Sequence, residues 1–542
     1  MSGSAHIDRF VRDNLPPAEL LPEFLFELPQ LDYPAGLNCA AELLDRMVAS
    51  GNGERRCIVA PGVQWTYRDL LERANRIAQV LVKDLGLVPG NRVLLRSANN
   101  PMMAACWFAV MKAGGVAVAT MPLLRSRELT DVIVKAEISH ALCDARLADE
   151  LRTAMQDCPT LRQVAWFNGD HPGDPTSLEA RMAAQPAVFE SIDTAADDPC
   201  LIAFTSGTTG KPKGTVHFHR DVLAICDCWP RSVLHAQPDD LFTGSPPLAF
   251  TFGLGGLLLF PMRVGAATLL LEKASPDKLL PAIAEYGATI CFTTPTAYRA
   301  MAAKAREHDL SRLRKCVSAG EALPDATRHL WRDVSGIELI DGIGSTEMLH
   351  IFISADEHSL RTGATGRAVP GYRACVVDDV GKPLPAGAAG RLAVKGPTGC
   401  RYLADERQHK AVQNGWNLTG DVYLMDADGY FFCQGRSDDM IISSGYNISA
   451  PEVESALLEH PLVSECAVIG VADSERGQIV KAFVVLRDAR KGSEELVAEL
   501  QEFVKQQIAP YKYPRAIAFR DSLPRTETGK LQRFRLRDDR AS

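Results

Sequence analysis

Helical and strand-like segments alternate along most of this chain, and that alternation restricts its fold more than any other feature. Amphipathic helix patterns and short apolar strand patterns occur at residues 67–81, 92–95, 101–113, 115–119, 278–286, 288–293, 326–334 and 338–341. Such alternation is typical of helices packed on a largely parallel sheet. We therefore predict an α/β fold. Because no long period repeats, a solenoid or propeller is not expected.

The pattern changes twice toward the C-terminus. After Gly363 the chain has short β-rich segments with Gly and Pro turns, which suggest a small β subdomain. After Arg436, helix and strand patterns alternate over about 100 residues, a natural domain size. We predict a large multi-layer domain at residues 1–436, made of two α/β subdomains and the small β subdomain. A smaller, mobile α+β domain is predicted at residues 437–542.

Composition excludes several classes of protein. Hydrophobic residues make up 46% and charged residues 23% of the 542 residues, as in globular proteins. The net charge of the chain is −8, whereas a nucleic-acid-binding protein usually has an excess of basic residues. The 14 cysteines form no CxxC pair, which favours reduced, buried thiols over disulfides or a zinc site. With no apolar leader at the N-terminus, we predict a cytoplasmic protein.

An uncharged stretch at residues 241–262, between Asp240 and Arg263, is long enough to cross a bilayer. Three prolines interrupt it, and four glycines lie within it. These residues break or loosen a helix, so we predict buried loop, turn and strand in the core and no membrane span.

The strongest local motif directly follows an apolar run at residues 201–204. It reads Thr205-Ser206-Gly207-Thr208-Thr209-Gly210-Lys211-Pro212-Lys213-Gly214. Glycines let a backbone approach a ligand, hydroxyls donate hydrogen bonds and lysines supply positive charge, so the motif predicts a phosphate-binding loop. A polar hairpin turn is the alternative. A Walker A loop is excluded, because Thr205 stands where its first Gly belongs and Pro212 follows the Lys.

Four further motifs follow in order. They are Gly342-Ile343-Gly344-Ser345-Thr346-Glu347, then Trp416 with Thr419-Gly420-Asp421, then Gly435-Arg436-Ser437-Asp438-Asp439, and then Pro524-Arg525-Thr526-Glu527-Thr528-Gly529-Lys530. With the loop at 205–214, they resemble the pattern of the adenylate-forming superfamily of acyl-CoA synthetases, adenylation domains and luciferases. The resemblance covers nearly the whole chain from Trp65 onward.

Two of these motifs carry acidic residues suited to a nucleotide. The hydroxyl and carboxylate of Thr346-Glu347 suit a phosphate oxygen and the Mg²⁺ that neutralises a triphosphate. Asp421 can accept two ribose hydroxyls, although an ordinary turn Asp explains it equally well without the family. The resemblance implies that Thr346 contacts the α-phosphate, that Glu347 helps to hold Mg²⁺ and that Arg436 assists at the ribose and phosphate. It also implies cofactor binding by Thr205, Ser206, Gly207, Thr208, Thr209, Gly210, Lys213, Asp341, Gly342 and Ile343.

The C-terminal domain carries three residues with implied roles. Attack of a carboxylate on an α-phosphate concentrates negative charge, and a positioned ammonium stabilises it. The resemblance makes Lys530 this adenylation lysine. It also makes Asp438 the hinge about which the domain rotates between the two half-reactions. Gly445 then lines the pantetheine tunnel, where a missing side chain gives the arm room.

Within the superfamily, the chain resembles aryl-CoA ligases of the benzoate and 2-aminobenzoate group. The residues behind this lie at 319–324, 341–352 and 509–515. The resemblance implies that the acyl group is surrounded by Phe250, Thr251, Phe252, Ser318, Ala319, Gly320, Gly344, His350 and Ile351. Benzoate ligases have a segment resembling Phe-Ala-Tyr at the position of Phe250-Thr251-Phe252 in this chain. Thr251 thus adds a hydroxyl in place of a methyl side chain, and this hydroxyl can hydrogen-bond to an ortho amino group. We predict 2-aminobenzoate as substrate, with benzoate or another substituted benzoate as alternative.

The implied reaction has two steps, with ATP, Mg²⁺ and coenzyme A as cofactors or co-substrates. ATP and the aromatic carboxylate give aryl-AMP and pyrophosphate, and the CoA thiol then displaces AMP. No cysteine is needed as a nucleophile. Two alternatives stay open: a stand-alone adenylation enzyme that loads a carrier protein, and a non-catalytic adenylate- or acyl-binding protein. A monomer and a homodimer are equally compatible with the sequence.

Overall fold

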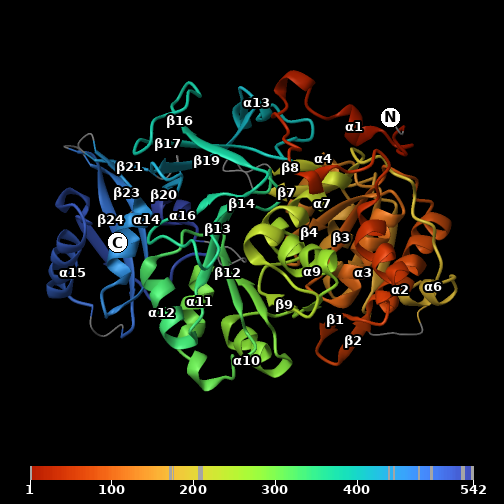
Figure 1. Cartoon of the computed structure of the whole chain (residues 1–542), viewed down its shortest axis with the longest axis horizontal. Helices are drawn as coiled ribbons and strands as arrows, with labels where there is room; N and C mark the ends of the chain where they lie inside the picture. The colour runs from red at the N-terminus through yellow and green to blue at the C-terminus, as the bar shows by residue number, and fades with distance from the viewer. Residues whose placement is uncertain are drawn as a thin grey trace.

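The computed structural model describes residues 3–169, 174, 176–205, 212–436, 440–443, 446–473, 476–488, 492–525 and 531–538. Within these ranges, four β-sheets with their covering helices form a large N-terminal body and a small C-terminal one. Figure 1 shows the C-terminal elements, in blue, at one end of the molecule beside α11 and α12. The predicted α/β class and its division into a large and a small part are confirmed.

The first sheet has the strand order β6-β5-β3-β4-β7-β8 and is parallel except for the hairpin of β7 and β8. Its strands are β3 (Arg92–Arg96), β4 (Val116–Thr120), β5 (His140–Asp144), β6 (Gln163–Phe167), β7 (Pro199–Thr205) and β8 (Lys213–Phe218). The helices of this part are α2 (Tyr67–Gln79), α3 (Pro101–Lys112), α4 (Ser126–Lys135), α5 (Ala148–Met155), α6 (Leu178–Ala183) and α7 (His219–Asp227). A capping box between Thr66 and Asp69 starts α2.

The second sheet has the order β15-β14-β13-β12-β11-β9-β10-β1-β2. Its strands are β1 (Arg56–Ala60), β2 (Val63–Thr66), β9 (Leu241–Gly244), β10 (Ala267–Leu269), β11 (Ile290–Thr293), β12 (Lys315–Ala319), β13 (Leu339–Gly344), β14 (Ile351–Ser354) and β15 (Arg367–Ala368). The helices between them include α10 (Pro276–Tyr286), α11 (Pro295–Ala302) and α12 (Asp325–Ser335). Because β11, β12 and β13 are parallel, their C-terminal ends meet at one sheet edge.

The uncharged stretch at 241–262 differs from its prediction. After β9 it turns helical over α8 (Thr251–Leu254), the π-helical η8 (Gly255–Leu259) and α9 (Phe260–Val264). The expected burial is confirmed, but loop and strand were wrong for residues 251–262. Pro261 lies inside this continuous helical run, just after the π-helical turn η8, and π-turns within helices are common where the regular hydrogen-bond ladder is interrupted. In the described part of the chain, no helix is long and apolar enough to cross a membrane.

A five-stranded antiparallel sheet follows, the predicted small β subdomain. It contains β16 (Arg373–Val377), β17 (Ala389–Lys395), β18 (Val412–Gln413), β19 (Trp416–Met425) and β20 (Phe431–Arg436), with the short helix α13 (Gln408–Ala411). The C-terminal sheet contains β21 (Ile441–Ser443), β22 (Tyr446–Ile448), β23 (Val463–Asp473), β24 (Gly477–Leu486) and β25 (Ala516–Phe519). Its helices are α14 (Ala450–Leu458), α15 (Glu494–Gln507) and α16 (Arg533–Asp538).

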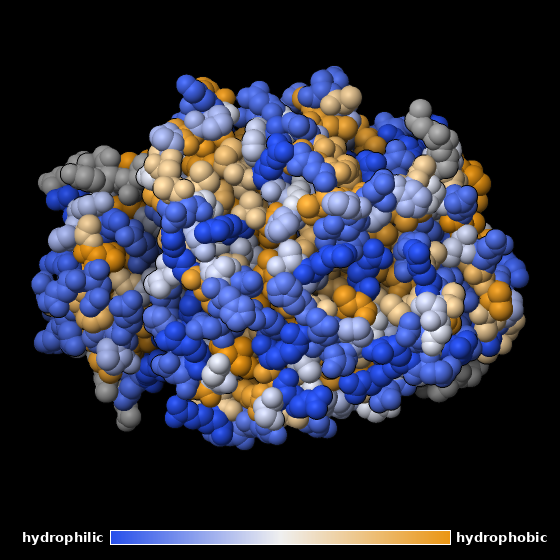
Figure 2. Space-filling model, viewed as in Figure 1, coloured by the Kyte–Doolittle hydropathy of each residue, from blue (hydrophilic) through white to orange (hydrophobic). Residues whose placement is uncertain are grey.

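β20 is the last strand of the small β subdomain, and β21 is the first strand of the C-terminal sheet. The C-terminal sheet and its helices enclose a separate hydrophobic core that includes Val453, Val468 and Leu500. The predicted boundary between residues 436 and 437 stays a prediction, since residues 437–439 lie outside the described ranges. On the face shown in Figure 2, hydrophilic and hydrophobic residues are interspersed. All 14 cysteines are free, and most are buried, as predicted.

Candidate active site

The phosphate-binding motif connects the paired strands β7 and β8. Thr205 ends β7, Lys213 begins β8, and the two residues lie opposite each other in the hairpin. The hydroxyl of Thr205 is buried and has no hydrogen-bond partner among the described residues, so it can donate to a ligand. Of the predicted loop residues, Ser206, Gly207, Thr208, Thr209 and Gly210 lie outside the described residues.

Lys213 and Glu347 meet at Tyr402. The ammonium of Lys213 donates to the Tyr402 hydroxyl at 2.8 Å and lies 3.8 Å from Glu347 Oε1. The Tyr402 hydroxyl in turn donates to Glu347 Oε1 at 2.5 Å. Burial raises the pKa of Tyr402, and the Glu347 carboxylate raises it further, so the phenol keeps its proton. The second carboxylate oxygen of Glu347 has no partner among the described residues, which suits a carboxylate ligand of Mg²⁺.

Sequence reasoning missed Tyr402, which directly follows Arg401 in a segment whose pattern gives no phosphate signal. It comes to the site because Tyr402 pairs with Thr215 of β8 in an isolated bridge. A tyrosine in the connection between β17 and α13 carries no local signature. Only its packing against β8 shows its place.

A buried ionic group lies under the Thr346-Glu347 turn. His217 of β8 donates from Nε2 to the carbonyl oxygen of Thr346 at 2.9 Å. Asp221 lies 3.9 Å from Nδ1 of His217 and accepts from Arg401 at 2.6 Å. Burial alone would raise the pKa of Asp221, but Arg401, His217 and Arg220 together outweigh it and lower the pKa to about 2. His217 thus holds the backbone that carries Thr346 and Glu347, and the fully buried pair of Asp221 and Arg401 lies beside it.

The predicted nucleotide residues come from two sheets. Asp341, Gly342, Ile343 and Gly344 end β13, while Asp421 of β19 pairs with Arg436 of β20 at 3.2 Å between Oδ1 and NH1. Burial raises the pKa of Asp421, with Arg436 opposing it and the charge of Glu347 adding to it. Thus the structure brings Asp421 near Glu347.

Asp341 is fully buried, and one of its carboxylate oxygens has no partner among the described residues. Burial raises the pKa of Asp341 to about 7, although Arg328 opposes the shift. Gly342 packs against Ile351 of β14, where an added Cβ would come within 2.8 Å of the isoleucine side chain. These contacts position the strand that leads into Ser345 and Thr346.

Two of the predicted acyl-binding residues, Phe252 and His350, lie in a cluster of aromatic side chains. The ring centroid of His350 lies 4.5 Å from Phe260, 5.7 Å from Phe252 and 5.8 Å from Trp229. Phe292 of β11 joins the wall, 5.6 Å from Phe252. We call these five residues the His350 wall. Sequence reasoning did not single out Trp229, Phe260 or Phe292, since a buried aromatic residue between apolar neighbours looks like ordinary core.

His350 is neutral in this setting. Burial lowers its pKa to about 3, and neither ring nitrogen has a hydrogen bond of normal geometry among the described residues. Gly255 makes this packing possible, because an added Cβ would lie 2.4 Å from Cδ2 of His350. The wall is therefore tightly packed, uncharged and rich in aromatic rings.

The remaining predicted acyl residues lie on neighbouring elements. Phe250 caps α8, and Thr251, which is 9% exposed, begins it. Ser318 and Ala319 end β12, with Gly320 directly after them, and the buried Ser318 hydroxyl has no partner among the described residues. Three further predicted residues, Asp438, Gly445 and Lys530, lie outside the described residues.

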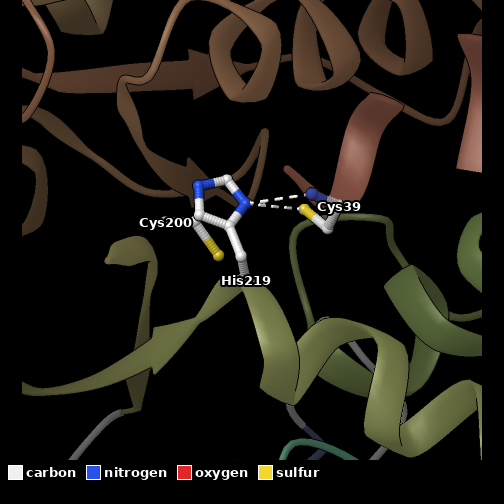
Figure 3. A group of neighbouring side chains, drawn as sticks. All are labelled: Cys39, Cys200 and His219. Carbon is white, nitrogen blue, oxygen red and sulfur yellow. Dashed lines mark hydrogen bonds between the residues drawn. The ribbon is translucent and has the colours of Figure 1, made fainter. Parts of the chain in front are cut away.

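A separate group of potential metal ligands, Cys39, Cys200 and His219, is present among the described residues. Figure 3 shows Nδ1 of His219 directed at Cys39. The backbone N–H of Cys39 donates to this nitrogen at 3.2 Å, so its lone pair is already engaged. We therefore interpret these three residues as a hydrogen-bonded part of the core.

Comparison with known protein families agrees with this geometry. A family described as "AMP-binding enzyme" matches residues 46–402, and the "AMP-binding enzyme C-terminal domain" matches residues 452–530. The chain is 36% identical to the benzoate–CoA ligase of Thauera aromatica over 516 residues, which cover 94% of this chain and 97% of that protein.

Solved structures give the same result. The crystal structure of the anthranilate CoA ligase AuaEII in complex with anthranoyl-AMP is similar with a TM-score of 0.90 and 35% identity, covering 94% of this chain and 98% of that one. A benzoate CoA ligase from Burkholderia xenovorans LB400 has a TM-score of 0.84 and 33% identity, covering 92% and 99%. With its paired β7–β8 motif, its Glu347 group and its His350 wall, the chain belongs to the AMP-binding enzyme family of the adenylate-forming superfamily and is an AMP-forming acid–thiol ligase.

Proposed function

We propose that this ligase activates 2-aminobenzoate as an acyl-AMP mixed anhydride and transfers the acyl group to coenzyme A. The observation that carries the proposal is the His350 wall, in which neutral aromatic side chains pack around one neutral imidazole. Such a surface accepts a flat ring and disfavours a second charge. The aryl-CoA ligases among the similar proteins support the same class of acid.

The choice of 2-aminobenzoate over benzoate rests on Thr251. Its hydroxyl can accept a hydrogen bond from an ortho amino group, which benzoate lacks. The similarity to an anthranilate CoA ligase supports this choice, and the similarity to benzoate ligases supports the runner-up.

In the first half-reaction, a carboxylate oxygen attacks the α-phosphorus of ATP and pyrophosphate leaves. Thr205 and Lys213 hold phosphate oxygens at the β7–β8 motif, and Asp421 with Arg436 holds the ribose. Lys530 stabilises the charge that develops at the α-phosphate. Thr346 contacts the same phosphate from a backbone that His217 anchors.

Glu347 would hold Mg²⁺ through its unpartnered oxygen, and the ion would supply charge neutralisation at the triphosphate. Tyr402 orients this carboxylate and keeps its own proton. In the second half-reaction the CoA sulfur attacks the acyl carbonyl, and AMP leaves. Gly445 gives the pantetheine arm room, after the domain at 437–542 has turned about Asp438.

Steady-state kinetics with ATP and CoA tests the proposal. We expect a higher kcat/KM for 2-aminobenzoate than for benzoate. Thr251→Val removes the hydroxyl at constant shape and should narrow the difference about fivefold, the worth of one neutral hydrogen bond. Thr251→Ala should narrow it as well, whereas Thr251→Ser keeps the hydroxyl and should retain the preference. A wild-type preference for benzoate would refute the 2-aminobenzoate assignment, and an unchanged preference in Thr251→Val would remove Thr251 from the explanation.

Omitting CoA separates this function from the loading of a carrier protein. A CoA ligase should form aryl-CoA with free CoA at a rate that matches AMP release. Slow turnover with CoA, together with rapid aryl-AMP formation, would favour the carrier-protein alternative.

A further inference from the structure

Arg525 lies in the C-terminal segment that leads to Lys530. Arg525 pairs with Leu531 in an antiparallel bridge, and the backbone N–H of Gln532 donates to the Pro524 carbonyl at 2.9 Å. Lys530 directly precedes Leu531 in the chain. Whatever holds Arg525 therefore also holds both ends of the segment that carries Lys530.

The guanidinium of Arg525 contacts the N-terminal body. Its NH1 lies 3.2 Å from Oε1 of Glu321 and donates to the hydroxyl of Thr296 at 3.3 Å. That hydroxyl donates to the other oxygen of Glu321 at 2.7 Å. On the opposite side, NH2 of Arg525 lies 2.7 Å from Glu465 of β23. One side chain thus joins the two bodies through contacts with Glu321, Thr296 and Glu465, which we call the Arg525 latch.

The latch lies at the sheet edge where the chemistry is expected. Thr296 stands in the first turn of α11, just after β11, and Glu321 follows Gly320, just after β12. These strands are parallel to β13, which ends at Gly344 beside the Thr346-Glu347 turn. Parallel strands place their C-terminal ends at one edge, so Arg525 docks next to the predicted acyl and phosphate residues.

A second contact supports the same arrangement farther from the site. Arg299, also on α11, donates to the carbonyl oxygen of Ser464 at 3.0 Å and to those of Leu458 and Val463 at 3.3 Å each. Its acceptors are backbone groups, whereas Arg525 has carboxylate partners that are 17% and 36% exposed. Charge-assisted contacts of this kind are stronger and depend on both partners.

We propose that Arg525 is a positioning residue for adenylation. The latch holds the C-terminal domain in the arrangement that brings the segment of Lys530 to the α-phosphate. The inference rests on the proposed function, in which thioester formation requires the same domain to turn away. A contact present in only one of two arrangements favours that arrangement by its own free energy, so losing the latch slows adenylation and spares thioester formation.

Separate half-reaction assays test this. Adenylation is followed by ATP–pyrophosphate exchange with 2-aminobenzoate, and thioester formation by adding CoA to supplied 2-aminobenzoyl-AMP. Arg525→Ala should lower adenylation about tenfold or more, with the thioester step within about twofold of wild type. Glu321→Gln should act in the same direction, and the double variant should be no slower than Arg525→Ala. Arg525→Lys should recover part of the rate.

Lys512→Ala is the matched control, since it removes an ion pair to Glu452 that lies wholly inside the C-terminal body. It should leave the ratio of the two half-reactions unchanged. Equal losses in both half-reactions for Arg525→Ala, or additive losses in the double variant, would overturn the proposal.

Hydrogen exchange without substrate gives a readout independent of the acid. Amides at residues 458–465, which border the interface through Arg299, should exchange faster in Arg525→Ala than in wild type or Lys512→Ala. If wild type forms no aryl-AMP, the proposed function fails, and the exchange rates alone decide on the latch. Unchanged exchange in Arg525→Ala would refute it.

Discussion

The side chains around Glu347 are charged groups and hydrogen-bond donors, whereas those around His350 are uncharged aromatic rings. Lys213, Tyr402 and Glu347 form a chain of charge-assisted hydrogen bonds, with the ion pair of Asp221 and Arg401 buried below it. In the His350 wall, burial keeps the imidazole neutral and aromatic contacts do the packing. In the function proposed above, the group around Glu347 contacts ATP whichever acid is bound, and the His350 wall selects the acid.

Loss of Lys530 should give the largest effect and tests the phosphate side. Lys530→Ala removes the cation expected at the α-phosphate, so aryl-AMP formation should fall about a hundred- to a thousandfold. Thioester formation from supplied aryl-AMP should stay near wild type. Lys505→Ala, in α15 of the same domain, is the control and should leave both steps unchanged. Equal loss of both steps would contradict separate roles for the two domain arrangements.

Overpacking the wall should come next. Gly255→Ala places a methyl group against Cδ2 of His350, and a strain of about 2 kcal/mol corresponds to roughly a thirtyfold loss in kcat/KM for aromatic acids. The KM for ATP should not change, because the phosphate side is not touched. Gly3→Ala, which adds a methyl group in open space, is the control. A matching rise in the KM for ATP would show that the His350 wall and the phosphate side are not independent.

Removing one hydroxyl on the phosphate side should cost less. Tyr402→Phe deletes the hydrogen bond to Glu347 and should lower kcat/KM about tenfold, by equal factors for 2-aminobenzoate and benzoate. The Mg²⁺ concentration for half-maximal rate should rise as well. Tyr430→Phe, whose hydroxyl donates to the Ser359 carbonyl, is the matched control. A change in acid preference in Tyr402→Phe would place Tyr402 on the acyl side.

The smallest expected effect is a dependence of stability on pH. The pKa of His350 is about 3 in the folded state and about 6.5 when unfolded, so the unfolded chain binds more protons between these values. Stability is full above pH 6.5 and falls toward pH 3, by at most about 1.4 kcal/mol per pH unit. His350→Asn should flatten this slope in urea unfolding between pH 7 and pH 5. His358→Asn, at an exposed histidine, should not. An unchanged slope in His350→Asn would show that the imidazole titrates normally.

Regular segments were predictable because their patterns are local. The helix expected at residues 101–113 is α3, and the strand expected at 92–95 is β3. The stretch at 251–262 was misjudged because its glycines signal flexibility in isolation. In the fold, Gly255 and Gly256 let the helix approach His350 and Phe292, where any side chain would collide. The reason for these glycines lies in residues far away in sequence.

Local spacing along the chain was enough to predict the α/β class, the order of the motifs and the types of residue expected to bind phosphate and ring. Tertiary structure alone decided the partners: Tyr402 reaches Glu347 across 55 residues, and Arg525 reaches Glu321 across 204. Such contacts depend on which strands pair and which sheet edges lie together, and the residues adjacent in sequence determine neither. The local sequence therefore predicted which kinds of residue the site contains, and tertiary packing determined which of them are in contact.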